Sequence, residues 1–209
     1  MATSVGHERL RMDNERKLPE ILLIGDSIRM GYCATVAADL ADTAKVVYPE
    51  ENCRNSQHVM TGIEGWAKLC ASPAIVHVNF GQWDTARFAG SSESLTSPVE
   101  YGRNADLIFK ALHRVFPGAE IVFATTTPMR PGPYEGPHPR FDSDIDLYNT
   151  IAVEAAGRNS VRIDDIHEFA RGWPSDAFAD SCHYTPESFA RIGHEVARFL
   201  RETLEKVIA

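Results

Sequence analysis

Residues 21–28 read Ile-Leu-Leu-Ile-Gly-Asp-Ser-Ile, and this segment decides the fold class of the chain. Four consecutive apolar residues end at Gly25, and the Asp-Ser pair that follows leads into a longer amphipathic stretch. A short run that is apolar throughout, rather than alternating, is typical of a parallel strand that is covered on both faces. The segment therefore predicts a buried strand that passes directly into a helix over residues 28–40.

The same pattern of a short apolar run and a longer amphipathic stretch recurs along the chain. Strand-like runs lie at residues 46–48, 74–78, 121–124 and 161–163, and helix patterns lie at 97–116, at 144–156 and after Thr185-Pro186-Glu187. Alternating strands and helices indicate an α/β sandwich around a mainly parallel five-stranded sheet. We expect one domain over residues 20–209, preceded by a polar extension over residues 1–19. The Pro- and Gly-rich segment 125–140 should form a loop at a cleft.

Composition limits the classes of partner. The net charge is −8 and no cluster of Lys or Arg could follow a phosphate backbone, so nucleic acid and anionic membranes are not expected as partners. The first twenty residues hold no apolar core of a signal peptide, and no segment has the apolar length of a membrane span. We expect a cytoplasmic protein, although a chain trimmed of its signal peptide would look the same. The four cysteines contain no CxxC pair and are expected to be reduced thiols, and no metal-ligand pattern is found.

Three polar motifs follow or flank the predicted strands, and they carry the functional signal. They are Gly25-Asp26-Ser27-Ile28, Asn79-Phe80-Gly81-Gln82-Trp83-Asp84 and Asp180-Ser181-Cys182-His183-Tyr184-Thr185. A serine at a strand-to-helix turn presents its hydroxyl at the carboxyl edge of the sheet, where ligands bind. An Asp three residues before a His can hold the imidazole through Nδ1. Each motif alone has a structural explanation as a cap or turn, but together they predict a Ser27-His183-Asp180 triad.

On these residues the sequence resembles the SGNH (GDSL-type) hydrolase family, and the resemblance covers most of the chain. Gly25-Asp26-Ser27-Ile28 is similar to the first block of that family, and Asp180-x-x-His183 to the last. The resemblance implies a three-layer flavodoxin-like sandwich and a serine esterase that forms an acyl-enzyme and needs no cofactor.

The central blocks depart from the family pattern. The loop of residues 50–56 lacks the usual oxyanion glycine, and Trp83 stands where the family has an oxyanion asparagine. An indole is not expected to replace a carboxamide donor without rearrangement. The oxyanion hole is predicted to use the Ser27 amide and Asn52, with Asn79 as second choice and Gly81 as a further contributor. A loop-stabilising role remains the alternative for each asparagine.

Aromatic residues near the predicted site suggest a carbohydrate substrate. Trp83, Tyr134 and Trp173 offer flat faces that suit sugar rings, with loop packing as the alternative, and Asp26 is counted with them as a substrate contact. Relatives with this kind of third block resemble carbohydrate acetylesterases, so we expect removal of a short acyl group, acetyl above all, from a sugar or other small ester. A lysophospholipase or thioesterase, or a degenerate domain that binds acylated glycans, remains an alternative. A nucleotide binder is disfavoured because residues 21–28 lack a Gly-rich fingerprint or a Walker lysine.

Overall fold

A five-stranded, all-parallel sheet forms the centre of the computed structural model, which describes residues 18–88 and 90–208. The strands are β1 (Glu20–Ile24), β2 (Lys45–Val47), β3 (Ile75–Val78), β4 (Glu120–Ala124) and β5 (Arg162–Asp164). Their order in the sheet is β2-β1-β3-β4-β5, and each neighbouring pair is parallel. This is the flavodoxin-like order, so the predicted fold class is confirmed.

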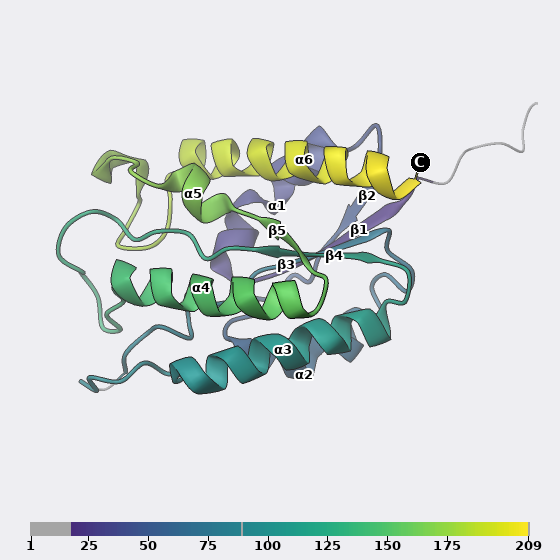
Figure 1. The fold of residues 1–209 in the computed structure, drawn as a ribbon. Helices are drawn as coiled ribbons and strands as arrows, with labels where there is room; N and C mark the ends of the chain where they lie inside the picture. The colour runs from purple at the N-terminus through teal and green to yellow at the C-terminus, as the bar shows by residue number, and fades with distance from the viewer. Residues whose placement is uncertain (1–17, 89, 209) are drawn as a thin grey trace, which may run out of the picture.

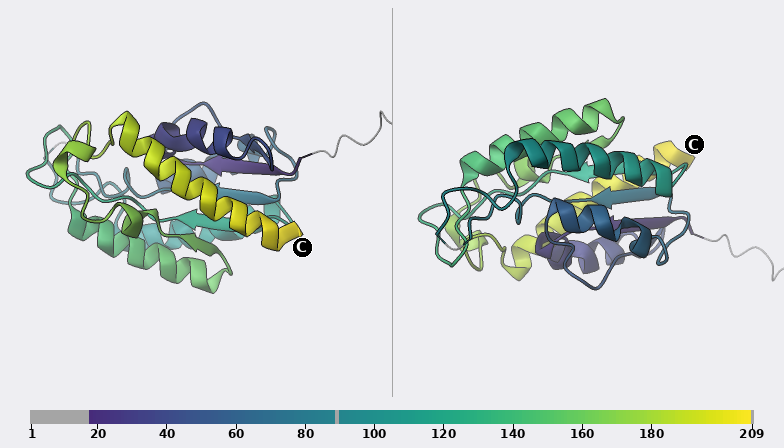
Figure 2. Two further views of the ribbon diagram at one scale, coloured as in Figure 1. Left: turned by 90° about the horizontal axis from the view of Figure 1, so that it is seen from above. Right: turned by 90° about the horizontal axis from the view of Figure 1, so that it is seen from below.

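Helices cover both faces of the sheet (Figures 1 and 2). Helices α1 (Ser27–Asp39), α5 (Ile166–Ala170) and α6 (Pro186–Ile208) lie on one face, and α2 (Ser56–Trp66), α3 (Pro98–Val115) and α4 (Asp142–Arg158) lie on the other. A single 3-10 turn, η1 (Ser175–Ala177), lies between α5 and α6. In β1, Ile21 and Leu23 pack with α1 and α6, whereas Leu22 and Ile24 pack toward α2 and α3. The run at residues 21–24 is apolar throughout because both faces are buried.

The sequence pattern does not predict helix α2. Gly62 and Gly65 lie inside it and, together with the β-branched Val59 and Ile63, weaken its intrinsic helix signal. The Asn55 side chain caps its first turn by accepting a hydrogen bond from the amide three residues on. Val59 and Ile63 are buried in the core beneath the sheet, so tertiary packing stabilises a helix that local propensity does not favour.

Three further expectations concern the whole chain. Of the predicted extension over residues 1–19, residues 1–17 lie outside the described part, so the domain boundary stays a prediction. All four cysteines are buried and unpaired. Within residues 18–88 and 90–208, no helix combines the length and the apolar character needed to cross a bilayer.

Buried Asp84 joins the loop after β3 to the start of α2. Its carboxylate accepts hydrogen bonds from the Ser56 amide at 3.0 Å and from Ser56 Oγ at 2.5 Å. Asn104 on α3 donates to the same Ser56 hydroxyl at 2.9 Å. Burial raises the pKa of Asp84 to about 6, although the hydrogen bonds from Ser56 lower the pKa in part. This network fixes the loop that leads to Trp83.

Replacing Asp84 by alanine should therefore destabilise the fold. Asp84→Ala leaves the buried Ser56 amide and hydroxyl without their acceptor, and we expect a loss of about 2–4 kcal/mol in the free energy of unfolding. Urea unfolding at neutral pH measures the loss. The matched control is Asp176→Ala at an exposed position in η1, for which we expect a change under about 0.5 kcal/mol. Equal losses in the two variants would show that the network does not stabilise the fold.

Candidate active site

Ser27 is the first residue of α1 and lies in a turn that Asp26 and Asn79 hold. Asp26 Oδ1 accepts hydrogen bonds from the Ile28 amide at 2.9 Å and from Asn79 Nδ2 at 3.0 Å. Glycine is required at residue 25, because a Cβ there would lie 1.8 Å from Asn79 Oδ1. Asp26 is completely buried, and this burial raises its pKa. The structure thus corrects two assignments: Asp26 is too buried to contact substrate, and the Asn79 amide donates to Asp26 rather than to an oxyanion.

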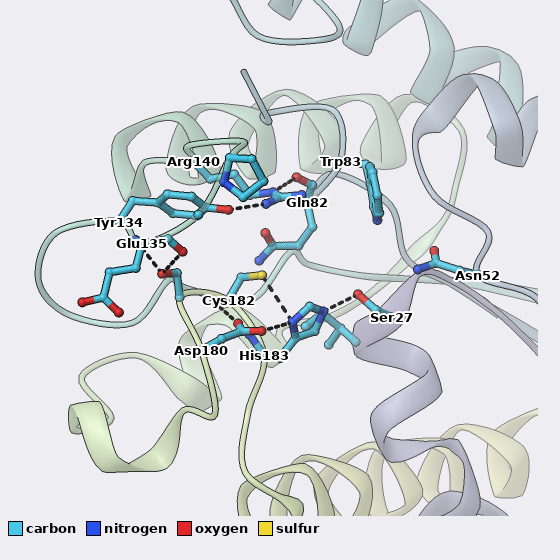
Figure 3. Close-up of a pocket in the computed structure, with 14 residues that line it drawn as sticks. Ser27, Asn52, Gln82, Trp83, Tyr134, Glu135, Arg140, Asp180, Cys182 and His183 are labelled. Carbon is cyan, nitrogen blue, oxygen red and sulfur yellow. Dashed lines mark hydrogen bonds and ion pairs between the residues drawn. The ribbon is translucent and has the colours of Figure 1, made fainter. Parts of the chain in front are cut away.

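A hydrogen-bonded chain connects Ser27 to Asp180 through His183 (Figure 3). His183 Nε2 lies 2.8 Å from Ser27 Oγ, and His183 Nδ1 lies 2.7 Å from Asp180 Oδ2. The second carboxylate oxygen, Asp180 Oδ1, accepts the amides of Cys182 at 2.8 Å and His183 at 2.7 Å. An ionised Asp180 requires a proton on Nδ1, which leaves Nε2 as the acceptor that faces the serine hydroxyl.

The surroundings of Asp180 keep its carboxylate ionised. Partial burial acts to raise the pKa, but hydrogen bonds from the Cys182 and His183 amides and from the imidazole outweigh it and lower the pKa to about 2. The carboxylate is therefore charged throughout the pH range in which a histidine titrates. A fixed negative charge at Nδ1 stabilises the imidazolium that forms when His183 takes a proton.

These three residues open into a pocket of about 410 Å³. Among the predicted substrate contacts, Trp83 and Tyr134 line this pocket together with Asn52 (Figure 3). Trp173 does not reach it. Its ring is buried against Phe169 and Tyr184, with the Arg191 guanidinium 4.1 Å from its centroid, so loop packing is its role.

The remaining oxyanion candidates differ in what their polar atoms contact. Asn52 Oδ1 accepts the Arg54 amide at 2.9 Å, while its Nδ2 has no partner among the described residues and points toward the Ser27 side of the pocket (Figure 3). Gly81 does not line the pocket. It has a φ of 137°, and a Cβ there would lie 2.1 Å from Thr126 Oγ1, so a glycine is needed for close packing of the turn.

Trp83 is oriented differently from the sequence-based expectation. Its indole nitrogen is directed into the pocket, on the side where Ser27 and Asn52 lie (Figure 3). No hydrogen bond within the described residues engages this N–H, and it is not sealed from solvent. Trp83 thus brings a free N–H donor into the pocket, at the position where the family resemblance implies an asparagine.

Two further lining residues, Gln82 and Arg140, are not singled out by the sequence analysis. Arg140 Nε donates to the Gln82 carbonyl at 2.6 Å, and the Gln82 side chain donates to the Thr127 carbonyl at 2.9 Å. Their only signal in the sequence is position, since Gln82 lies in the motif after the third strand and Arg140 ends the Pro- and Gly-rich segment.

One group of potential metal ligands occurs in the described part of the chain, and it coincides with the acid–base pair. Ligand atoms of Asp180, Cys182 and His183 lie within 4.8 Å of one another. Two of the three ligand atoms already contact each other, since His183 Nδ1 lies 2.7 Å from Asp180 Oδ2, and burial raises the pKa of the Cys182 thiol to about 12. The group therefore fits a proton relay better than a metal site.

Solved structures with the same fold support the expected resemblance. A lipase/acylhydrolase from Enterococcus faecalis superposes with a TM-score of 0.68 at 18% identity, covering 89% of this chain and 97% of its own. A carbohydrate acetylesterase from Sinorhizobium meliloti gives 0.68 at 14% identity, with coverages of 88% and 99%. A GDSL-like lipase from Bacteroides thetaiotaomicron gives 0.63 at 14% identity, with coverages of 90% and 88%.

Neither a protein-family model nor a curated protein matches this sequence. The fold is nevertheless that of the SGNH (GDSL-type) hydrolases, which confirms the family resemblance at the level of the fold. Identities this low establish shared architecture, and the chemistry is therefore argued from the site itself.

The relay makes a specific prediction about pH. Because the pKa of Asp180 is about 2, protonation of this carboxyl should not limit the kcat/KM for ester hydrolysis at any pH above about 4. Asp180→Asn should lower kcat by about 10²- to 10⁴-fold, because an amide does not hold the required tautomer. Asp176→Asn, outside the pocket, is the control and should leave kcat unchanged. An ionisation near pH 5 that is present in the wild-type profile and absent in Asp180→Asn, or full activity of Asp180→Asn, would contradict this role.

Proposed function

We propose that this protein is a carboxylic ester hydrolase that uses Ser27 as nucleophile, His183 as general base and acid, and Asp180 as the residue that orients the imidazole. The observation that carries the proposal is the continuous Asp180–His183–Ser27 hydrogen-bond chain at the wall of a pocket. A serine becomes a nucleophile when a base accepts its proton, and the 2.8 Å contact between His183 Nε2 and Ser27 Oγ is within the required reach.

The reaction proceeds in two halves. Ser27 Oγ attacks the ester carbonyl carbon while its proton passes to His183 Nε2, and the carbonyl oxygen becomes an oxyanion. The oxyanion collapses, the bond to the alcohol oxygen breaks, and His183 gives its proton to that oxygen. Water then attacks the acyl-enzyme, passes a proton to His183 and releases the carboxylic acid, after which the proton returns to Ser27.

Three N–H groups are proposed to form the oxyanion hole: the Ser27 amide, Asn52 Nδ2 and Trp83 Nε1. The Ser27 amide belongs to the first turn of α1, where amides are not used by the helix itself. The free donors of Asn52 and Trp83 in the same pocket support their inclusion, whereas the Asn79–Asp26 hydrogen bond and the position of Gly81 outside the pocket lining argue against those two residues.

The proposed substrate is a short-chain acyl ester, acetyl above all, on a carbohydrate. Trp83 and Tyr134 supply aromatic faces of the kind that pack against sugar rings. The structural neighbour from Sinorhizobium meliloti is itself described as a carbohydrate acetylesterase. Ile28 is the only Ile, Leu, Val, Met or Phe among the described lining residues, which disfavours the long acyl chains of a lysophospholipase. The assembled relay likewise disfavours a domain that only binds acylated glycans.

Acyl-chain length and Ser27 dependence test the proposal together. With 4-nitrophenyl acetate, butyrate and octanoate, we expect kcat/KM to be highest for acetate and lowest for octanoate, because the described lining of the pocket offers few aliphatic side chains to a long acyl chain. Ser27→Ala should lower the rate by at least about 10³-fold on each ester. Ser92→Ala, at an exposed position, is the control and should behave as wild type. Equal rates for wild type and Ser27→Ala would refute the esterase assignment.

The oxyanion hole has its own test. Trp83→Phe keeps an aromatic ring beside the pocket but removes the N–H, and Asn52→Ala removes the carboxamide. Each should lower kcat by about 10- to 10³-fold with little change in KM, because these donors act on charge that develops in the transition state. Trp173→Phe removes an indole N–H outside the pocket and should keep its kcat. A Trp83→Phe enzyme with wild-type kcat would exclude the indole from the hole.

A further inference from the structure

A buried arginine lies in the wall of the pocket that Ser27 and His183 share. Arg140 is the only Arg or Lys among the described residues that line this pocket, and it is 8% exposed. Its guanidinium donates to neutral oxygens alone: the Gln82 carbonyl at 2.6 Å, the Tyr134 hydroxyl at 3.1 Å and the His138 carbonyl at 3.3 Å. The Trp83 ring lies near it, with 5.7 Å between the guanidinium carbon and the ring centroid.

The positive charge of Arg140 has no contacting carboxylate within the described chain. The two carboxylates that line the pocket are engaged elsewhere: Asp180 holds His183 at 2.7 Å, and Glu135 pairs with Arg130 at 2.9 Å. The buried Asp26 acts on Arg140 only at longer range and also faces Arg29. A buried cation without a paired anion is unfavourable, so the site gains stability when a ligand brings the missing negative charge.

The guanidinium is also held in a position from which it can bind such a ligand. Three hydrogen bonds fix Nε and Nη1, while Nη2 has no partner among the described residues and is not sealed from solvent. The N–H groups of Nη2 can donate a charge-assisted hydrogen bond to a carboxylate oxygen, and because the guanidinium is already fixed, little entropy is lost on binding. Arg140 and Ser27 line one pocket of about 410 Å³, so one small molecule can reach both.

We propose that Arg140 forms an anion-binding subsite and that the ester substrate carries a carboxylate in the part that does not react. This inference rests on the proposed esterase function and specifies its substrate class. The carboxylate can belong to the acyl half, as in a half-ester of a dicarboxylic acid, or to the alcohol half, as in an acetylated uronic acid. The chemistry at Arg140 is the same in both cases, and kinetics distinguish the two sources.

The experiment compares acidic substrates with neutral partners of nearly equal shape. One arm uses the 4-nitrophenyl ester of succinic acid against that of monomethyl succinate, and the other uses acetylated glucuronic acid against its methyl ester. In one arm we expect kcat/KM to be about 10- to 100-fold higher for the acid, as for a charge-assisted hydrogen bond. The arm that shows the preference identifies the half that carries the carboxylate.

Substitutions locate the preference at Arg140. Arg140→Met should reduce the acid-to-neutral ratio to about one, while Arg140→Lys, which keeps the charge, should retain part of it. Arg130→Met is the matched control, because it removes an equal charge from the same loop but one already paired with Glu135, and should keep the preference. Thermal melting confirms that each variant is folded. A wild-type enzyme without preference in either arm overturns the proposal, as does an equal loss in Arg130→Met and Arg140→Met.

Binding to a variant without the nucleophile separates this proposal from the esterase assignment. Glucuronate and succinate are titrated into Ser27→Ala and into the Ser27→Ala, Arg140→Met double variant by calorimetry. If Ser27→Ala binds either carboxylate and the double variant does not, the subsite is supported. This holds even if no ester is hydrolysed in a Ser27-dependent way. Ser27-dependent hydrolysis without acid preference, and without binding that depends on Arg140, refutes the subsite and leaves the esterase function intact.

Discussion

The hydrogen bond from Asn79 to Asp26 is the contact on which the geometry of the site depends. It joins the end of β3 to the turn after β1, and the same Asp26 oxygen caps α1 through the Ile28 amide. The parallel pairing of β1 with β3 brings the two segments together, and Gly25 leaves room for the Asn79 carboxamide. Ser27 therefore takes its position from a buried carboxylate that no substrate reaches. Hydrogen bonds to the carboxylate offset part of the cost of burying it.

Much of the fold could be predicted because its signals are local. Continuous apolar runs mark the strands, and α3 begins directly after Ser97, which forms a capping box with Glu100. Helix α2 could not be placed, because its glycines and β-branched residues hide a helix that burial against the sheet stabilises. An element can be predicted from the sequence where local propensity and tertiary packing favour the same structure. It cannot be predicted where tertiary packing alone determines the structure.

The same distinction between local signals and tertiary contacts applies to the residues of the candidate site. Asp180 and His183 are three residues apart, so their contact could be read from spacing, and Ser27 could be read from its place at a strand end. The side-chain directions of Asn79, Trp83 and Trp173 follow from tertiary contacts that spacing does not encode, and so does the complete burial of Asp26. Arg140 gave no signal because its defining contact, with the Gln82 carbonyl, spans 58 residues.

The local character of the Asp180–His183 contact also bears on how the site assembles during folding. This pair closes within one turn of chain, whereas the contact between His183 and Ser27 joins residues 156 positions apart. Local contacts form early at little entropic cost, and distant ones wait for the sheet to form. The relay thus needs a single long-range docking event, that of the segment before α6 onto the start of α1. Local opening of that segment would break the contact between His183 and Ser27 while the sheet stays folded.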